Sequence, residues 1–197
     1  MRLPDDFTKQ MHTLLGDEDY DMFIRALQMP APASVRFNTW KTDSLLLSAF
    51  HSQLDKEIPW CSASYYLKQR LTFTFDPLFH AGCYYVQEAS SMFLEQAIKQ
   101  YVQKPVVMLD LCAAPGGKST HIQSLLPEDS LLVANEIIRS RSHVLAENLT
   151  KWGYPNLIVT NNDPADFTPL TDFFDVILAD VPCSGEGMFR KNTEAIN

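Results

Sequence analysis

The chain has 197 residues, and its hydrophobic content of 46% is ordinary for a globular protein with one good core and a smaller lobe. No apolar run approaches the length of a membrane span and the N-terminus has no signal-peptide core, so we expect a cytoplasmic protein with no membrane partner. Sixteen basic residues against 24 acidic ones give a net charge of −8, the wrong sign for a chain that holds RNA through its phosphates alone.

The first part of the chain, residues 1–78, is predicted to form a small α+β lobe. Apolar residues at helical spacing predict two helices that Gly16 separates, over residues 5–15 and 17–27. The remaining predicted elements of this lobe are a strand at 34–38, a helix from Thr42 to about Leu54, and extended chain over 65–75.

Residues 79–197 are predicted to form a Rossmann-like core, because strands and helices alternate along them. The predicted strands cover residues 106–111, 131–136, 156–161 and 174–180, and the predicted helices cover residues 89–101, 117–126 and 138–152. Gly153 stands where a left-handed residue ends a helix. Helices of this length between strands imply right-handed crossovers and therefore a parallel sheet.

A strand, a glycine turn and a helix start follow one another at residues 106–119. Asp110 interrupts the apolar strand near its carboxyl end, where open α/β sheets bind ligands, and Gly116 and Gly117 turn the chain. A P-loop would need a glycine where Cys112 stands, and a dinucleotide fold would need three spaced glycines. A looser turn of this kind is typical of methyltransferases that bind S-adenosylmethionine.

Acidic residues follow the next two predicted strands. Glu136 comes about 20 residues after the glycine turn, a separation that suits ribose recognition; a solvated carboxylate at a helix start is the alternative. Asp163 follows the third strand, where methyltransferases place an acid near the adenine; a turn residue is the alternative, because Asn-Asp-Pro forms turns readily. We favour cofactor binding for both.

The fourth predicted strand ends at Asp180-Val181-Pro182-Cys183. In amino-methylating enzymes of this fold an aromatic residue occupies the place of Cys183. A thiolate that adds to carbon 6 of a pyrimidine makes carbon 5 nucleophilic enough to take a methyl group. Asp180 is placed to protonate or hydrogen-bond ring N3 if burial raises its pKa. Residues 184–187 form a glycine-containing loop that could close over an extruded base.

Three motifs together resemble the Sun/Nop-type RNA cytosine-5 methyltransferases. Asp-Leu-Cys-Ala-Ala-Pro-Gly-Gly-Lys-Ser (residues 110–119) is similar to the family's cofactor motif, and Asp-Val-Pro-Cys-Ser-Gly-Glu-Gly-Met-Phe (180–189) to its active-site motif. Residues 79–92 resemble its pre-core segment. The resemblance implies S-adenosylmethionine as cofactor and ribosomal RNA as partner. The four cysteines form no Cys-x-x-Cys pair, so we expect no metal site.

The site residues follow from the strand ends and the resemblance together. Cys183 and Asp180 are the expected catalytic residues. The expected cofactor-binding residues are Cys112, Ala113, Ala114, Pro115, Gly116, Gly117, Lys118, Glu136, Arg141, Asp163 and Asp180. Arg141 is assigned to the cofactor or to RNA.

The resemblance further implies two cysteines, of which the one at Cys183 assists product release and a second, in a Thr-Cys motif, is the nucleophile. No such motif occurs in the 197 residues, so we expect a fragment that ends before the nucleophile. Cys61 and Cys83 are expected to be buried small hydrophobes. The alternatives are a non-catalytic RNA- or cofactor-binding module that kept the fold, and a small-molecule or amino-methylating enzyme.

Residues 34–41 resemble a motif of the family's RNA-facing lobe. Arg36 would pair with a phosphate and Trp40 would stack on a base. A salt-bridged arginine and a core tryptophan are the alternatives.

Overall fold

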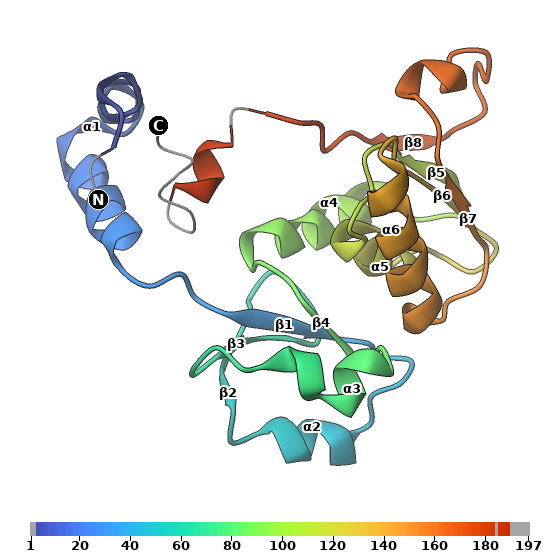
Figure 1. The fold of residues 1–197 in the computed structure, drawn as a ribbon, viewed down its shortest axis with the longest axis horizontal. Helices are drawn as coiled ribbons and strands as arrows, with labels where there is room; N and C mark the ends of the chain where they lie inside the picture. The colour runs from blue at the N-terminus through green and yellow to red at the C-terminus, as the bar shows by residue number, and fades with distance from the viewer. Residues whose placement is uncertain (1–2, 184, 190–197) are drawn as a thin grey trace. The chain divides into compact units, whose positions relative to one another are not determined.

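The computed structural model describes residues 3–183 and 185–189. These separate into two compact units, residues 3–32 with 182–183 and 185–189, and residues 33–181 (Figure 1). In the first unit, α1 (Asp5–Gln28) is broken at Gly16, whose φ of 75° and ψ of 176° are not helical. This break confirms the two predicted helices. The unit also contains η4 (Glu186–Met188), and the buried Phe189 ring packs on that of Phe7 with centroids 5.1 Å apart.

The second unit begins with a four-stranded antiparallel sheet in the order β2-β3-β1-β4. Its strands are β1 (Ser34–Phe37), β2 (Leu54–Glu57), β3 (Ser64–Leu67) and β4 (Tyr84–Val86). Between β1 and β2, α2 (Ser44–Phe50) starts at Asp43, whose side chain accepts a hydrogen bond from the Leu46 amide. The helix is shorter than the predicted 42–54, because the chain turns after Phe50 and pairs as β2 from Leu54 onward.

Aromatic side chains fill the core of this sheet. Phe37, Phe50 and Tyr84 are buried and pack ring against ring, with Phe50 and Tyr84 centroids 5.2 Å apart. Two short helices, η1 (Phe73–Phe75) and α3 (Pro77–His80), lead from β3 to β4. Because β4 pairs with β1, residues 84–86 belong to this sheet; the predicted domain boundary at residue 78 stays a prediction.

The rest of the second unit is a parallel sheet in the order β7-β6-β5-β8, which confirms the predicted α/β class. Its strands are β5 (Val107–Asp110), β6 (Leu131–Asn135), β7 (Leu157–Thr160) and β8 (Val176–Leu178). Chain order runs outward from β5 to β7 on one side, and β8 lies on the other. The strand order therefore reverses at β5, and such a switch point is where open α/β sheets bind ligands.

Helices cover one face of the parallel sheet (Figure 1). They are α4 (Leu94–Tyr101), which η2 (Ser90–Phe93) precedes, α5 (Gly117–Gln123) and α6 (Arg139–Trp152). Ile122 of α5 packs on Met108 and Leu132, and Leu145 of α6 packs on Ala134. These three strand residues share one side of the pleat, so Asp110, two residues after Met108, points toward the helices as well.

Two smaller features complete the fold. Gly153 ends α6 in the left-handed conformation with a φ of 89°, as predicted. The short helix η3 (Pro164–Phe167) lies between β7 and β8. Among the described residues, no helix is both long enough and apolar enough to span a membrane.

Candidate active site

Asp110 ends β5 at the switch point and is 1% exposed. Its Oδ2 accepts a hydrogen bond of 2.6 Å from the Ser119 hydroxyl, whereas its Oδ1 is buried and has no partner among the described residues. Burial raises the pKa of Asp110 to about 6; the Ser119 hydrogen bond and the Lys118 charge oppose this rise, and Asp180 adds to it. An unsatisfied buried acceptor at this edge suits a ligand that brings a donor.

The glycine turn lies directly beside Asp110 and depends on both glycines. Gly116 has a φ of 108°, and a Cβ there would lie 3.3 Å from Leu145 Cδ1. A Cβ at Gly117 would lie 3.3 Å from Tyr85 Cε1. The turn therefore packs closely on α6 and on the end of β4, as expected for a close backbone approach.

Side chains hold the carbonyls of the turn. Arg141 Nη2 donates to the Ala114 carbonyl at 2.9 Å, and Asn148 Nδ2 donates to the Pro115 carbonyl at 2.7 Å. The first amides of α5 have no partner inside the helix, as at any helix start. The arrangement leaves backbone donors for a ligand and fixes the carbonyls on the protein side.

Glu136 follows β6 and is 2% exposed, so the alternative of a solvated carboxylate is wrong. Its Oε1 accepts from the amide of Ile138, the residue before α6, at 3.0 Å, and its Oε2 lies 3.3 Å from Arg141 Nη1. Arg141 thus bridges Glu136 and the glycine turn, and the structure brings these predicted residues together.

Asp163 follows β7 and is exposed. Its side chain accepts from the Ala165 amide at 2.9 Å and forms a capping box with Asp166, so it initiates η3 as a turn residue. Its predicted contact with the adenine stays a prediction. Asn135 at the end of β6 connects this loop to the site, because its Nδ2 donates to the carbonyls of Leu111 and Asn162.

Asp180 follows β8, and its side chain forms an ion pair with Lys118 from the first turn of α5. The cofactor motif and the start of the active-site motif therefore meet. The Asp180 side chain is 55% exposed, so the burial on which its acid role depended is not present here.

The electrostatics of Cys112 show which acids share this edge. Burial raises the pKa of the Cys112 thiol, and the carboxylates of Glu136, Asp110 and Asp180 raise it further. Carboxylates at the ends of three different strands therefore raise the pKa of the same thiol. Cys183 belongs to the other unit and is exposed, and Ser184 of its loop lies outside the described residues.

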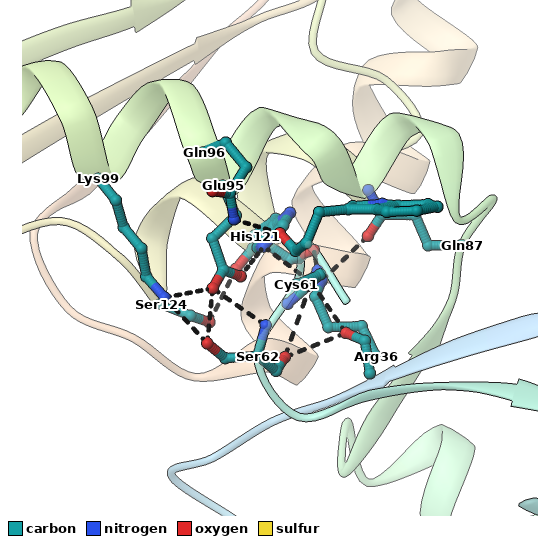
Figure 2. A network of polar contacts seen from close by, with 12 residues as sticks. Arg36, Cys61, Ser62, Gln87, Glu95, Gln96, Lys99, His121 and Ser124 are labelled. Atoms are coloured by element: carbon teal, nitrogen blue, oxygen red, sulfur yellow. Dashed lines mark hydrogen bonds and ion pairs between the residues drawn. The ribbon is translucent and has the colours of Figure 1, made fainter. Parts of the chain in front are cut away.

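A second polar cluster is made by Cys61 from between β2 and β3, Glu95 of α4 and His121 of α5 (Figure 2). His121 Nε2 lies 2.9 Å from Glu95 Oε2 and 3.5 Å from Cys61 Sγ. Burial lowers the pKa of His121 to about 4, so its ring is neutral. Burial alone would raise the pKa of Glu95, but hydrogen bonds from His121, Lys99 and Ser62 outweigh it and lower that pKa.

The ligand atoms of this cluster lie within 4.8 Å of one another, a spacing that a metal ion would accept. Positive charge already surrounds it, because Lys99 Nζ lies 2.6 Å from Glu95 Oε1 and Arg36 acts on Cys61. These cations disfavour a further one. Local sequence reasoning missed the cluster, because its members stand 26 to 60 positions apart.

Arg36 and Trp40, the two residues assigned to RNA contact, differ in their exposure. Arg36 is 2% exposed and forms no ion pair within the described residues; its contacts are hydrogen bonds and a ring, which contradicts both alternatives. Trp40 is 60% exposed, with its ring 4.5 Å from that of Tyr154, so it is not a core residue. Cys61 and Cys83 are buried, as predicted.

A parallel sheet with its strand order reversed at β5, a glycine turn after that strand and acids after its neighbours define a Rossmann-like methyltransferase fold. A methyltransferase homologue from Pyrococcus horikoshii matches 97% of this chain, and 68% of its own, with a TM-score of 0.72 and 26% identity. The structure of NSun6 from Pyrococcus horikoshii shares the fold, with a TM-score of 0.74 and 18% identity over 92% of this chain and 71% of that one.

Two family models cover most of the sequence. Residues 3–89 match the N-terminal domain of 16S rRNA methyltransferase RsmF, and residues 99–196 match the 16S rRNA methyltransferase RsmB/F family. The chain belongs to this RsmB/F family, which confirms the Sun/Nop-type resemblance, and the match of residues 3–89 is to the RsmF domain. Ribosomal RNA small subunit methyltransferase F of Serratia proteamaculans is 37% identical over 99% of this chain, which spans 42% of that relative's length.

Proposed function

We propose that the protein methylates carbon 5 of a cytosine in RNA, with S-adenosylmethionine as methyl donor. Its family indicates 16S ribosomal RNA as the substrate. The observation that carries the proposal is the unpaired, buried Oδ1 of Asp110 at the switch point of the sheet. A buried acceptor without a partner is costly unless a ligand supplies a donor.

The residues at this edge fit the cofactor. S-adenosylmethionine carries a cationic sulfonium and ammonium group, a carboxylate, and ribose hydroxyls, and when bound it supplies a reactive methyl group. Asp110 and Asp180 would offer negative charge to its cations, and Lys118 and the amides of residues 112–118 would hold its carboxylate.

The ribose and the adenine would lie toward β6 and β7. Glu136 would accept from ribose hydroxyls, because each carboxylate oxygen keeps a lone pair besides its bond to Ile138 or Arg141. Asp163 would lie near the adenine, and Arg141 would order both Glu136 and the turn.

Cysteine chemistry would activate the base. A thiolate adds to carbon 6 of cytosine, carbon 5 then takes the methyl group, a base removes the carbon 5 proton, and the thiolate leaves. Cys183 is exposed, as this chemistry requires, and by family resemblance it assists release. Cys61 is a poor nucleophile, because burial raises its pKa to about 12, and burial raises the pKa of Cys83 as well.

Asp180 would lie between the cofactor and the base, where its carboxyl could hydrogen-bond ring N3. Its present partner is Lys118, and it is half exposed. For Asp180 to act as an acid, the target base would have to cover it. We therefore expect Asp180→Asn to slow methyl transfer by a larger factor than it weakens cofactor binding.

The proposal is tested in two steps with the 197-residue chain. Calorimetric titration with S-adenosylmethionine tests the cofactor site, with Glu136→Ala as the site variant and Glu147→Ala, an exposed glutamate on α6, as the control. We expect Glu136→Ala alone to weaken binding. Unchanged affinity in Glu136→Ala would refute the placement, and absence of binding in the wild type would refute the proposed cofactor.

RNA that contains 5-fluorocytidine tests the base chemistry, because fluorine at carbon 5 blocks release and traps the nucleophile. A denaturation-resistant adduct that disappears in Cys183→Ala would make Cys183 the nucleophile. Cofactor binding without an adduct, which we expect, would place the nucleophile outside these 197 residues. Methylation that modifies only exocyclic amines, detected by nucleoside mass spectrometry, would contradict the proposal.

A further inference from the structure

Arg36 lies on β1 of the antiparallel sheet, yet its side chain reaches the helix that starts at the glycine turn (Figure 2). Its side chain is buried and only 2% exposed. Burial lowers the pKa of Arg36 to about 10, so the guanidinium still carries its charge at neutral pH. Burying a charge without an ion-pair partner costs free energy, so the position of Arg36 needs a reason beyond packing.

The contacts of Arg36 converge on the first turn of α5. Nη2 donates to the Thr120 hydroxyl at 2.7 Å and to the Gly117 carbonyl at 3.2 Å. The Thr120 hydroxyl in turn donates to the same Gly117 carbonyl at 3.1 Å. One nitrogen therefore fixes both the last residue of the glycine turn and the side chain one helical turn later.

Two further contacts fix the orientation of the guanidinium plane. Nε donates to Gln87 Oε1 at 3.0 Å, and the guanidinium lies over the Trp152 ring at 4.6 Å from its centroid. Gln87 itself lies against the turn, because a Cβ on Gly117 would be 3.7 Å from its Cδ. A planar fork that stacks and donates along several edges is a property of arginine that lysine does not share.

We propose that Arg36 is a positioning residue for the cofactor turn: it fixes the start of α5, and with it the Gly117 and Lys118 amides, in the conformation that binds S-adenosylmethionine. The inference rests on the proposed cofactor site. It also assigns the buried arginine of the supposed RNA-facing motif to the protein interior, where no phosphate reaches it.

The chain contains a matched control directly after the same strand. Asn38 is 0% exposed, and its Nδ2 donates to the carbonyls of Gly82 and Trp152, the latter at the far end of α6 from the glycine turn. Asn38→Ala removes two buried hydrogen bonds, to the Gly82 and Trp152 carbonyls, and neither of them involves α5. It therefore reports the effect of lost stability alone.

The test compares Arg36→Lys, Thr120→Val and Asn38→Ala in the 197-residue chain at a temperature at which all remain folded. Calorimetry measures the Kd for S-adenosylmethionine, and hydrogen exchange measures the amides of residues 117–120. Loss of a charge-assisted hydrogen bond predicts a Kd at least about tenfold higher in Arg36→Lys and Thr120→Val, and a change of less than about twofold in Asn38→Ala.

The double variant Arg36→Lys/Thr120→Val should bind no more weakly than the weaker single variant, because both changes break one contact. Equal Kd values for Arg36→Lys and Asn38→Ala would overturn the proposal. If the wild type bound no cofactor, the proposed function would fail, but hydrogen exchange would still test the positioning role of Arg36. Faster amide exchange of residues 117–120 in Arg36→Lys than in Asn38→Ala would support that role, and equal exchange in the two variants would overturn it. If Arg36→Lys did not fold, Thr120→Val against Asn38→Ala would give the same decision.

Discussion

Replacing Asp110 by Asn should make the protein more stable and its cofactor binding weaker. Asp110 is 1% exposed and burial raises its pKa from 3.8 to about 6, so the folded chain pays to ionise it. At 1.36 kcal/mol per pH unit, the penalty reaches roughly 3 kcal/mol once the pH exceeds the folded pKa. Asn removes the charge and keeps an oxygen that accepts from Ser119.

The sign of this effect follows from the two protonation states. Below pH 3.8 the carboxyl is protonated in both the folded and the unfolded chain, so the charge costs nothing. Between pH 3.8 and about 6 the unfolded chain loses the proton first, which favours unfolding, and above pH 6 the penalty is complete. The stability gained by Asp110→Asn should therefore grow from near zero at pH 4 to roughly 3 kcal/mol at pH 8.

Urea unfolding of the wild type and of Asp110→Asn at several pH values between 4 and 8 measures this difference. Asp129→Asn is the control, because Asp129 is exposed and its left-handed backbone, with a φ of 67°, suits asparagine equally well. Calorimetry on the same samples should show weaker binding of S-adenosylmethionine to Asp110→Asn. A gain that did not vary with pH, or a loss of stability at pH 8, would refute the reasoning.

Three further changes test the neighbouring residues. Glu136→Gln should keep the fold, because its amide oxygen still accepts from Ile138, and should raise the Kd for S-adenosylmethionine about tenfold in a calorimetric titration; an unchanged Kd would exclude a ribose contact. In the wild type, the free energy of unfolding should fall as the pH drops from 6.5 to about 4, because the imidazole of His121 takes up a proton in the unfolded chain but not in the folded one, where it lies beside Glu95, Lys99 and Arg36. His121→Gln should reduce this fall in urea unfolding. An unaltered pH profile would contradict a neutral His121. Gly116→Ala should lower the free energy of unfolding by more than the roughly 1–2 kcal/mol of left-handed strain, because its Cβ would lie 3.3 Å from Leu145, whereas Gly185→Ala, with a φ of 76° and nothing within 4 Å, should show the strain alone.

Local patterns in the sequence sufficed for the parallel sheet and its turn. Each central strand is a contiguous apolar run, and apolar runs between helices predict buried parallel strands whatever lies around them. The strand β2 was not predicted, because Leu54-Asp55-Lys56-Glu57 is an edge strand whose last three residues are exposed and polar. This segment lacks the alternation of apolar and polar residues that predicts a strand, so only its pairing with β3 identifies it.

The buried polar residues were not predicted, because their hydrogen-bond partners lie far away in the sequence. The bond between Arg36 and Thr120 spans 84 positions, and nothing near Arg36 distinguishes a buried arginine from one that faces RNA. The same holds for Glu95 and His121, which are each charged or titratable and each 1% exposed. Polar residues of this kind are buried only because their partners satisfy them, and a single sequence does not show which partners meet.

The acids of the site differ in a way that strand position alone does not predict. Glu136 and Asp163 both follow strands as expected, but each already accepts a hydrogen bond within the protein, Glu136 from the Ile138 amide and Asp163 as the N-cap of η3. Asp110 keeps one buried oxygen without a partner. A ligand therefore gains most at Asp110, where it relieves an existing penalty, whereas at Glu136 and Asp163 it adds to bonds already made. We accordingly expect Asp110→Asn to raise the Kd for the cofactor more than Asp163→Asn does.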